Sequence, residues 1–289
     1  MSSSWMSQSG VMTWLAVTAC MGVKPHEGPD TATPVPTTTY TWTYTYTPTY
    51  DVPPCEPEKD GRCVCTFEGH VCNQWTMDWL APCTDIPGTI VLSDDHQCFG
   101  TPVISSIPPM QLQRVGSMSV LWGTYVSSLS GFSRLEEVAE DLEISSLNEL
   151  HNLRGLESLR RVGGELIISS VPITDVEPLF NLEQVRTLDI GYTEVRDLRG
   201  LEKLERLWTL RLSGESIRSL AGLENVHAVD SYLTVDTPFV TSLDGLASLE
   251  QAGQVTLQTG RICRSEWDAF LARVVIDSLD YAPPIDESC

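Results

Sequence analysis

The sequence of 289 residues predicts an α/β repeat solenoid built around one parallel β-sheet. The main observation is a unit of about 22 to 24 residues that recurs between Phe132 and Gly260. Each unit reads roughly L-x-x-L-x-x-[LV] and then L-x-[IL], and the units begin at Phe132, Leu156, Leu179, Leu201, Leu223 and Leu246. Such self-similarity is typical of a solenoid, because one unit cannot bury its own apolar face and needs stacked neighbours.

Each unit supplies one short predicted strand, and strands that all run the same way form a parallel sheet. The expected strands are Ile90–Leu92, Met118–Val120, Leu142–Ile144, Leu166–Ile168, Leu188–Ile190, Leu210–Leu212, Leu233–Val235 and Val255–Leu257. We expect the leucine-rich arcs between the strands to fill the interior. The glycines of these arcs, Gly155, Gly200, Gly222 and Gly245, would allow a tight corner.

The charge balance of the chain limits the classes of partner that it is expected to bind. Asp and Glu number 39 against 18 Lys and Arg, which gives a formal net charge of -21. Such a surface repels phosphate backbones, so nucleic-acid binding is not expected. The acidity fits either a cationic partner or simply the solubility of an exported protein.

The N-terminal sequence predicts that the protein is located in the cell envelope. A short apolar stretch, residues 11–17, leads into Val17-Thr18-Ala19-Cys20. This segment resembles the lipobox of bacterial lipoproteins, in which a signal peptide, here residues 1–19, is cleaved before a cysteine that is then lipidated. It departs from that pattern because no Lys or Arg precedes the apolar stretch and Val17 replaces the commoner Leu. The other interpretation is a short apolar terminus with an accidental cysteine.

Lipidation of Cys20 implies an exported protein that is anchored at the outer membrane or cell surface through lipid alone. No other stretch reaches the ~18 apolar residues that a membrane-spanning helix needs. Residues 20–54 are rich in Thr, Pro and Tyr and lack aliphatic periodicity, so they predict a tether between the lipid and the folded part. The alternation of Thr and Tyr in residues 39–47 leaves open a strand that pairs with a sheet edge.

The cysteines predict disulfides. Of nine cysteines, Cys20 accounts for the odd one, and the remaining eight suit an oxidising compartment. Six of them predict a stapled N-terminal cap over residues 55–98, with pairings that the sequence leaves open: Cys55, Cys63, Cys65, Cys72, Cys83 and Cys98. Zinc is not expected, because paired C-x-x-C units are missing.

The repeats over 188–201 and 210–223 resemble leucine-rich repeats. The variable spacing and the segment 161–168 are most similar to the receptor L-domain branch of that superfamily, whose bacterial members include cell-surface lipoproteins. The asparagine that usually follows each strand is absent, since its positions hold Val171, Thr193, Glu215 and Pro238. The resemblance covers about residues 90–289, with repeats over 90–260, and it implies binding rather than catalysis.

Residues 261–289 are expected to cap the last repeat. Ser265-Glu266 would begin a helix that runs to about Ile276 and buries one face, made of Trp267, Phe270, Leu271 and Val274. The tail is similar to the disulfide-closed ends of such lipoproteins. We expect Cys263 to pair with Cys289, with Pro283-Pro284 stiffening the return.

Catalytic motifs are missing from the sequence. It contains no G-x-S-x-G, H-E-x-x-H, P-loop or G-x-G-x-x-G pattern. The best metal candidate, Asp94-Asp95-His96, is equally typical of a solvated turn, so no metal, cofactor or enzymatic activity is expected. A secreted hydrolase is the enzymatic alternative.

A binding function would use the exposed face of the sheet. If Leu142 and Ile144 point inward, their neighbours along the strand point outward. The candidate ligand-binding residues on this face are Asp141, Glu143, Glu165, Asp189, Arg211 and Tyr232. The expected partner is a protein, a peptide or a glycan. The alternative is a structural or adhesive role in the envelope without a discrete ligand.

Overall fold

The computed structural model describes residue 55 and residues 61–93, 104, 106–122 and 125–289. The predicted lipidation at Cys20, the tether, the Asp94-Asp95-His96 turn and Cys98 lie outside the described residues.

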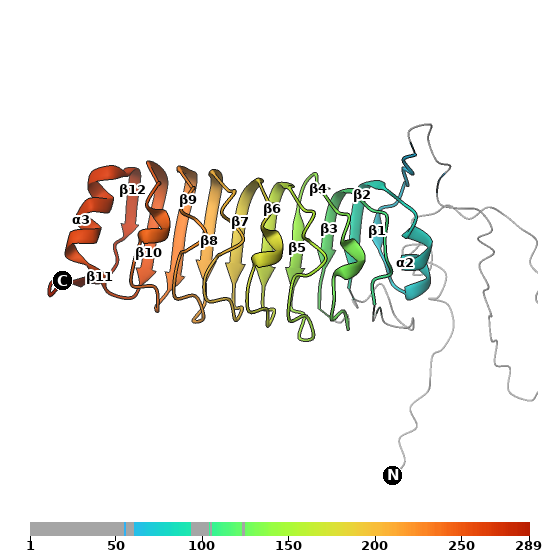
Figure 1. Cartoon of the computed structure of the whole chain (residues 1–289), viewed down its shortest axis with the longest axis horizontal. Coiled ribbons are helices and arrows are strands. Elements are labelled where there is room, and N and C mark those ends of the chain that lie inside the picture. The colour runs from blue at the N-terminus through green and yellow to red at the C-terminus, as the bar shows by residue number, and fades with distance from the viewer. Residues whose placement is uncertain (1–54, 56–60, 94–103, 105, 123–124) are drawn as a thin grey trace, which may run out of the picture.

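Most of the described chain winds around one large parallel sheet (Figure 1). Its 11 strands are β1 Gly69–His70, β2 Asp85–Leu92, β3 Arg114–Val120, β4 Glu137–Val138, β5 Leu142–Ser145, β6 Arg161–Ser169, β7 Gln184–Gly191, β8 Arg206–Ser213, β9 Ala228–Thr237, β10 Gln251–Thr259 and β12 Val275–Tyr281. Strands β4 and β5 together fill one place in the order, between β3 and β6. The arrangement is compatible with a solenoid-like repeat fold.

All eight predicted strands lie within strands of this sheet, and they are in the predicted register. Their first apolar residues pair in one row across the sheet: Ile90, Met118, Leu142, Leu166, Leu188, Leu210, Leu233 and Val255. The L-x-[IL] signature therefore marks the inward positions of each strand correctly.

Within the described residues, helices are few and lie outside the sheet. The α-helices there are α2 Gln74–Leu80 and α3 Arg264–Arg273, and the 3-10 turns are η2 Ser130–Phe132, η3 Glu177–Leu179 and η4 Asp244–Leu246. Figure 1 shows α2 and α3 at opposite ends of the stack. The Asn73 side chain caps α2 by accepting a hydrogen bond from the Thr76 amide at 2.9 Å.

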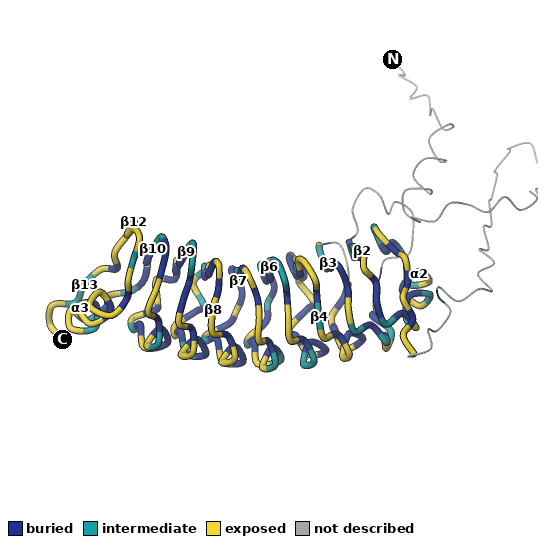
Figure 2. The backbone as a smooth tube through the Cα atoms, turned by 90° about the horizontal axis from the view of Figure 1, so that it is seen from above, coloured by how far each residue is buried: buried dark blue, intermediate teal, exposed yellow. Residues whose placement is uncertain are grey.

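One continuous core runs through the stack. Figure 2 shows buried backbone along the inside and exposed backbone along the arcs, with the strands on the gently concave side. Leu188 and Leu210 in the strands and Leu179 and Leu201 in the arcs are all fully buried. Each leucine is covered by the coils on either side of it, so burial depends on stacking.

Glycines let the coils approach closely. Gly200 and Gly222 have φ values of +109° and +108°, in the region that favours glycine. A Cβ on Gly222 would lie 2.0 Å from the Leu198 carbonyl oxygen. Gly245 differs because it lies in η4, and there a Cβ would lie 2.1 Å from the Leu220 carbonyl oxygen. Close packing alone therefore requires that glycine.

Asparagines do join the coils, but at a different corner from the one that follows each strand. Asn181 Nδ2 donates to the Glu157 carbonyl and Asn225 Nδ2 to the Glu202 carbonyl, each at 2.7 Å. Both lie two residues after the leucine that begins a unit. These bonds satisfy backbone carbonyls in the arcs, where the coil has no sheet partner.

The C-terminal end differs from the prediction. Helix α3 ends at Arg273 rather than near Ile276, and Leu271 is exposed, although Trp267, Phe270 and Val274 are buried as expected. The following residues form β12, which adds to β10 as the edge strand of the sheet. The β-branched run Val274-Val275-Ile276 favours this strand over a longer helix.

Disulfides lie at both ends. Cys263 and Cys289 form a disulfide with their Cα atoms 5.4 Å apart, beside a two-stranded parallel sheet of β11 Ile262–Cys263 and β13 Ile285–Asp286. At the other end the disulfides are Cys55–Cys63 and Cys65–Cys83, and Cys72 is also disulfide-bonded. Within the described residues, no helix is long and apolar enough to cross a membrane.

The fold predicts that stacking leucines dominate stability. Replacing Leu188 or Leu210 by Ala should cost about 2–5 kcal/mol of unfolding free energy, because each leaves a cavity in a fully buried row. Replacing the outward Asp189 by Asn should cost less than about 1 kcal/mol. Chemical denaturation measures both, and equal losses for the two kinds of change would contradict the strand register.

The C-terminal disulfide should stabilise the last coils. Cys263 and Cys289 are 26 residues apart in sequence, and closing a loop of this size is worth about 3–4 kcal/mol in the chain-entropy model. A Cys263→Ser/Cys289→Ser variant should therefore unfold at lower denaturant concentration, with amides of β10 and α3 exchanging faster than those of β6. Unchanged exchange at β10 and α3 would show that the disulfide is not needed there.

Candidate ligand-binding face

The outward row predicted on the sheet is present in register. Paired residues run across neighbouring strands from Ser119 to Thr256: Ser119, Glu143, Ile167, Asp189, Arg211, Thr234 and Thr256. Neighbouring parallel strands lie about 4.8 Å apart, so these side chains occupy a regular one-dimensional array.

The acidic residues of the early strands do not converge on one point. Asp141 Oδ1 accepts the Glu165 amide hydrogen at 2.8 Å, and Glu143 Oε1 accepts the Ser145 hydroxyl at 2.9 Å. Ile167 separates Glu143 from Asp189 in the row. The carboxylates of Asp141 and Glu143 therefore make local bonds within the sheet rather than a shared cluster.

Metal-ligating atoms gather elsewhere in the described part of the chain. There, three sulfurs lie within 4.8 Å of one another, those of Cys55, Cys63 and Cys65. All three belong to disulfides, Cys55–Cys63 and Cys65–Cys83, and a disulfide sulfur is not a thiolate ligand.

Asp189 and Arg211 form the charged centre of the face. Arg211 Nη1 lies 3.9 Å from Asp189 Oδ2. Burial raises the pKa of Asp189 above its ordinary value, and Glu165 adds to the rise, while Arg211 opposes it. Desolvation is the largest of these effects, so Arg211 does not fully offset the cost of burying the Asp189 carboxylate.

Trp208 is the main residue of this face that strand alternation does not predict. It lies on the outside of β8 and is 48% exposed, and Arg186 on β7 stacks over its ring at 5.5 Å from the centroid. Tyr232 on β9 pairs with Thr209, the residue next to Trp208, and is 45% exposed. We call Arg186, Trp208, Arg211 and Tyr232 the aromatic–arginine patch.

A shift in strand register explains the exposure of Trp208. Strict alternation would point Trp208 inward with Leu210, but the pairing of β8 with β9 shifts between Leu207 and Thr209. Both Leu207 and Leu210 are buried, and Trp208 between them is exposed. The same shift recurs in β6 at Gly163-Gly164 and in β10 at Gly253. The strands that pair with β8, which are β7 and β9, carry no glycine at this place, so the sequence gives no direct signal for the exposure of Trp208.

A shallow polar hollow adjoins the patch at the start of β6, β7 and β8. It encloses about 900 Å³, and its charged lining residues are Arg161, Glu183, Arg186, Glu202, Lys203, Glu205 and Arg206. Arg206 makes two hydrogen bonds to Asp230, at 2.8 and 2.6 Å. The patch is thus bordered by charges of both signs.

One serine–histidine contact bears on the hydrolase alternative. His70 Nδ1 lies 3.2 Å from Ser93 Oγ in the N-terminal part of the fold. A nucleophilic serine must be reached by substrate, but Ser93 is buried. The contact therefore suits a structural hydrogen bond better than catalysis.

Comparisons with known proteins add nothing to this geometry. No protein-family model matches the chain, and neither the curated proteins nor the solved structures include a significant match.

The raised pKa of Asp189 predicts a pH dependence. A carboxyl whose pKa is higher in the folded than in the unfolded state binds its proton more tightly when folded, so its contribution favours folding as pH falls. The wild type should therefore gain stability relative to Asp189→Asn as the pH is lowered from 7 towards 4. Thermal unfolding of both proteins across this range measures the difference. A relative loss for the wild type would mean that Arg211, not burial, controls the Asp189 pKa.

Proposed function

We propose that this protein is a non-catalytic lipoprotein of the cell envelope that presents a leucine-rich-repeat-like binding module, of the receptor L-domain type, to protein or peptide ligands. The single observation that carries the proposal is the aromatic–arginine patch. It lies on a sheet whose strands are held by a continuous core, and its side chains remain open to solvent.

The composition of the patch supports protein or peptide binding. Trp, Tyr and Arg are the residues that most often dominate the binding energy of interfaces. Trp208 is already positioned by Arg186, so little side-chain freedom is lost when a partner covers it. Thr187 and Thr209 beside the patch are buried, so the strands that carry the aromatic side chains are well packed at this place.

The charges around the patch favour a ligand with groups of both signs. Asp189 and Asp230 offer carboxylates, and Arg186 and Arg211 offer guanidinium groups. An extended peptide presents backbone donors and acceptors together with charged side chains, and it could lie across several strands. The overall charge of -21 should further speed the approach of basic peptides and make binding salt-dependent.

The proposed repeat type has physical support. One strand per unit of about 22 to 24 residues, parallel pairing and leucine-filled arcs are features that leucine-rich repeats share. Disulfides near both ends suit caps, since terminal coils lack a neighbour on one side.

The binding experiment uses soluble residues 55–289 and a random peptide library. We expect captured peptides to lose roughly 30-fold in affinity on Trp208→Ala or Tyr232→Ala, since hot-spot residues contribute about 2 kcal/mol or more. Phe180→Ala is the matched control, because Phe180 is an equally exposed aromatic on the arc side.

A second comparison tests the role of charge in peptide binding. Asp189→Asn should weaken binding, whereas Glu177→Gln, which changes an exposed acid in η3, should not. Glu202 is a poor control, because its carboxylate accepts the Gly200 amide hydrogen at 2.9 Å. Failure to enrich any peptide, or peptides that depend on Phe180 instead of Trp208, would refute the proposed face. The structural or adhesive role would then be favoured.

The proposed lipid anchoring in the cell envelope is tested separately. Several acyl chains anchor a protein stably, whereas one anchors it marginally, so a lipidated Cys20 should hold the chain in the membrane fraction. Replacing Cys20 by Ser should abolish labelling with radioactive palmitate and release the protein. Persistent labelling of the variant would show that the lipidation assignment is wrong.

A further inference from the structure

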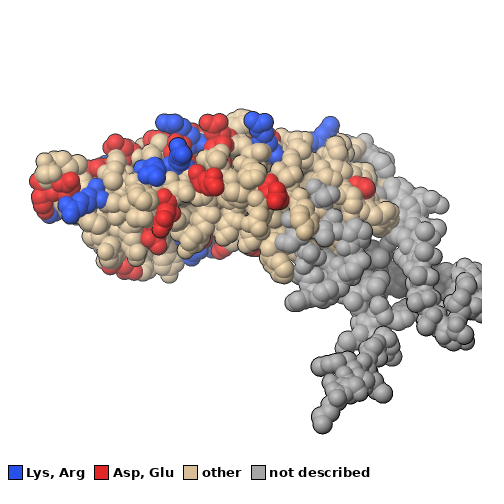
Figure 3. All heavy atoms as spheres, turned by 90° about the horizontal axis from the view of Figure 1, so that it is seen from below, with Lys and Arg blue, Asp and Glu red and all other residues tan. Residues whose placement is uncertain are grey.

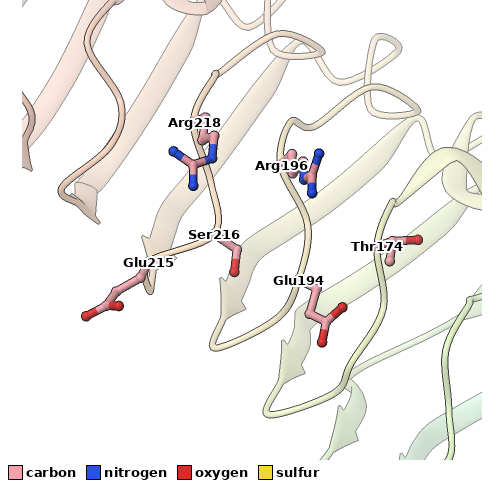
Figure 4. A pocket seen from close by; sticks show the side chains of 6 residues that line it. All are labelled: Thr174, Glu194, Arg196, Glu215, Ser216 and Arg218. Atoms are coloured by element: carbon pink, nitrogen blue, oxygen red, sulfur yellow. The ribbon is translucent and has the colours of Figure 1, made fainter.

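A second hollow opens on a different surface, where β6, β7 and β8 end and the arcs begin. It encloses about 510 Å³ and is lined by Thr174, Glu194, Arg196, Glu215, Ser216 and Arg218. These residues come from three successive coils (Figure 4). None of them belongs to the aromatic–arginine patch.

Two arginines are stacked one coil apart in this hollow. The Arg218 and Ser219 amides both donate to the Arg196 carbonyl, at 2.9 and 3.2 Å. Their side chains therefore leave neighbouring coils from aligned positions, about 4.8 Å apart. Like charges on directly opposed positions destabilise a folded protein, so the pair lowers stability unless something compensates it.

No carboxylate in the described part of the chain lies within ion-pair distance of either guanidinium group. Arg206 and Arg211, by contrast, are paired with Asp230 and Asp189. Arg218 stacks over Phe239, with its Cζ 4.7 Å from the ring centroid, which leaves its N–H groups free to donate sideways. Figure 3 shows basic and acidic side chains dispersed over the strand-end surface rather than in one continuous field.

The opposite side of the hollow presents acceptors. Figure 4 shows Arg196 and Arg218 on one side and Glu194 on the other, with Ser216 between them, while the Glu215 carboxylate is directed away from the other side chains. Guanidinium groups recognise a carboxylate with paired hydrogen bonds. Carboxylates and hydroxyls, in turn, accept hydrogen bonds from ligand hydroxyl groups.

We propose that this hollow binds an acidic sugar of the uronate class. The sugar carboxylate lies between Arg196 and Arg218, and its hydroxyl groups donate to Glu194 and Ser216. The volume suits one sugar unit or a short oligosaccharide, since ligand sites commonly span about 300–1,000 Å³. A simple oxyanion would leave the acceptor side unused, and a long polyanion would be repelled by the chain's net charge of -21.

The test titrates the full chain with glucuronate and galacturonate. Glucose, which has the hydroxyl groups but no carboxylate, and inorganic phosphate, which is an oxyanion without the sugar ring, serve as comparison ligands. We expect saturable binding of at least one uronate, with glucose and phosphate at least roughly tenfold weaker. Arg196→Gln and Arg218→Gln should each weaken uronate binding by roughly tenfold or more. Arg199→Gln, a neighbouring arginine that is paired with Asp197, is the matched control and should change nothing.

Each contrary result overturns a stated part of the proposal. If neither uronate saturates, or if both Gln variants bind like the wild type while keeping its unfolding midpoint, the hollow is not a binding site for acidic sugars. If phosphate binds as tightly as the uronates and Glu194→Gln changes nothing, the hollow is a simple oxyanion site and the sugar assignment is wrong.

Discussion

The stacking of each coil on the next is the interaction on which the rest of the structure depends. Leu188 and Leu210 are fully buried only because neighbouring coils cover them. The backbone follows the same rule, as the Glu183 amide bonds to the Arg160 carbonyl one coil earlier at 2.9 Å. Contacts between neighbouring coils therefore supply both the burial of apolar side chains and the hydrogen bonds of the backbone. The two ends of the stack lack one neighbour, and the disulfides lie there.

This constraint also organises the candidate sites. Because the inward positions are filled by buried apolar side chains, polar and charged residues are found mainly in the outward rows and at the corners. The coils of β7 to β9 carry both unusual features, the patch around Trp208 on the sheet face and the stacked Arg196 and Arg218 at the corner. The patch and the hollow have no lining residue in common, so two ligands of different chemistry would contact different side chains.

Most of the sheet could be predicted from the sequence, because the L-x-[IL] positions such as Leu188 and Leu210 are read directly as inward residues. The aromatic–arginine patch could be predicted only in part. Asp189, Arg211 and Tyr232 follow from alternation, but Trp208 depends on a register shift that only tertiary pairing reveals. The sequence prediction misses the end of α3 because the apolar spacing of Trp267, Phe270 and Val274 fits a helix face, whereas the β-branched Val275 and Ile276 that follow pair with β10 instead.

The central claim is that the sheet face around Trp208 contacts a ligand in the cell envelope. Hydroxyl-radical footprinting on intact cells, compared with the purified protein, tests this claim even while the ligand is unidentified. The account predicts that Trp208 and Tyr232 are oxidised more slowly on cells, whereas the equally exposed Phe180 on the arc side is oxidised at the same rate in both samples. Equal oxidation of Trp208 in both samples, or protection of Phe180 alone, would contradict it.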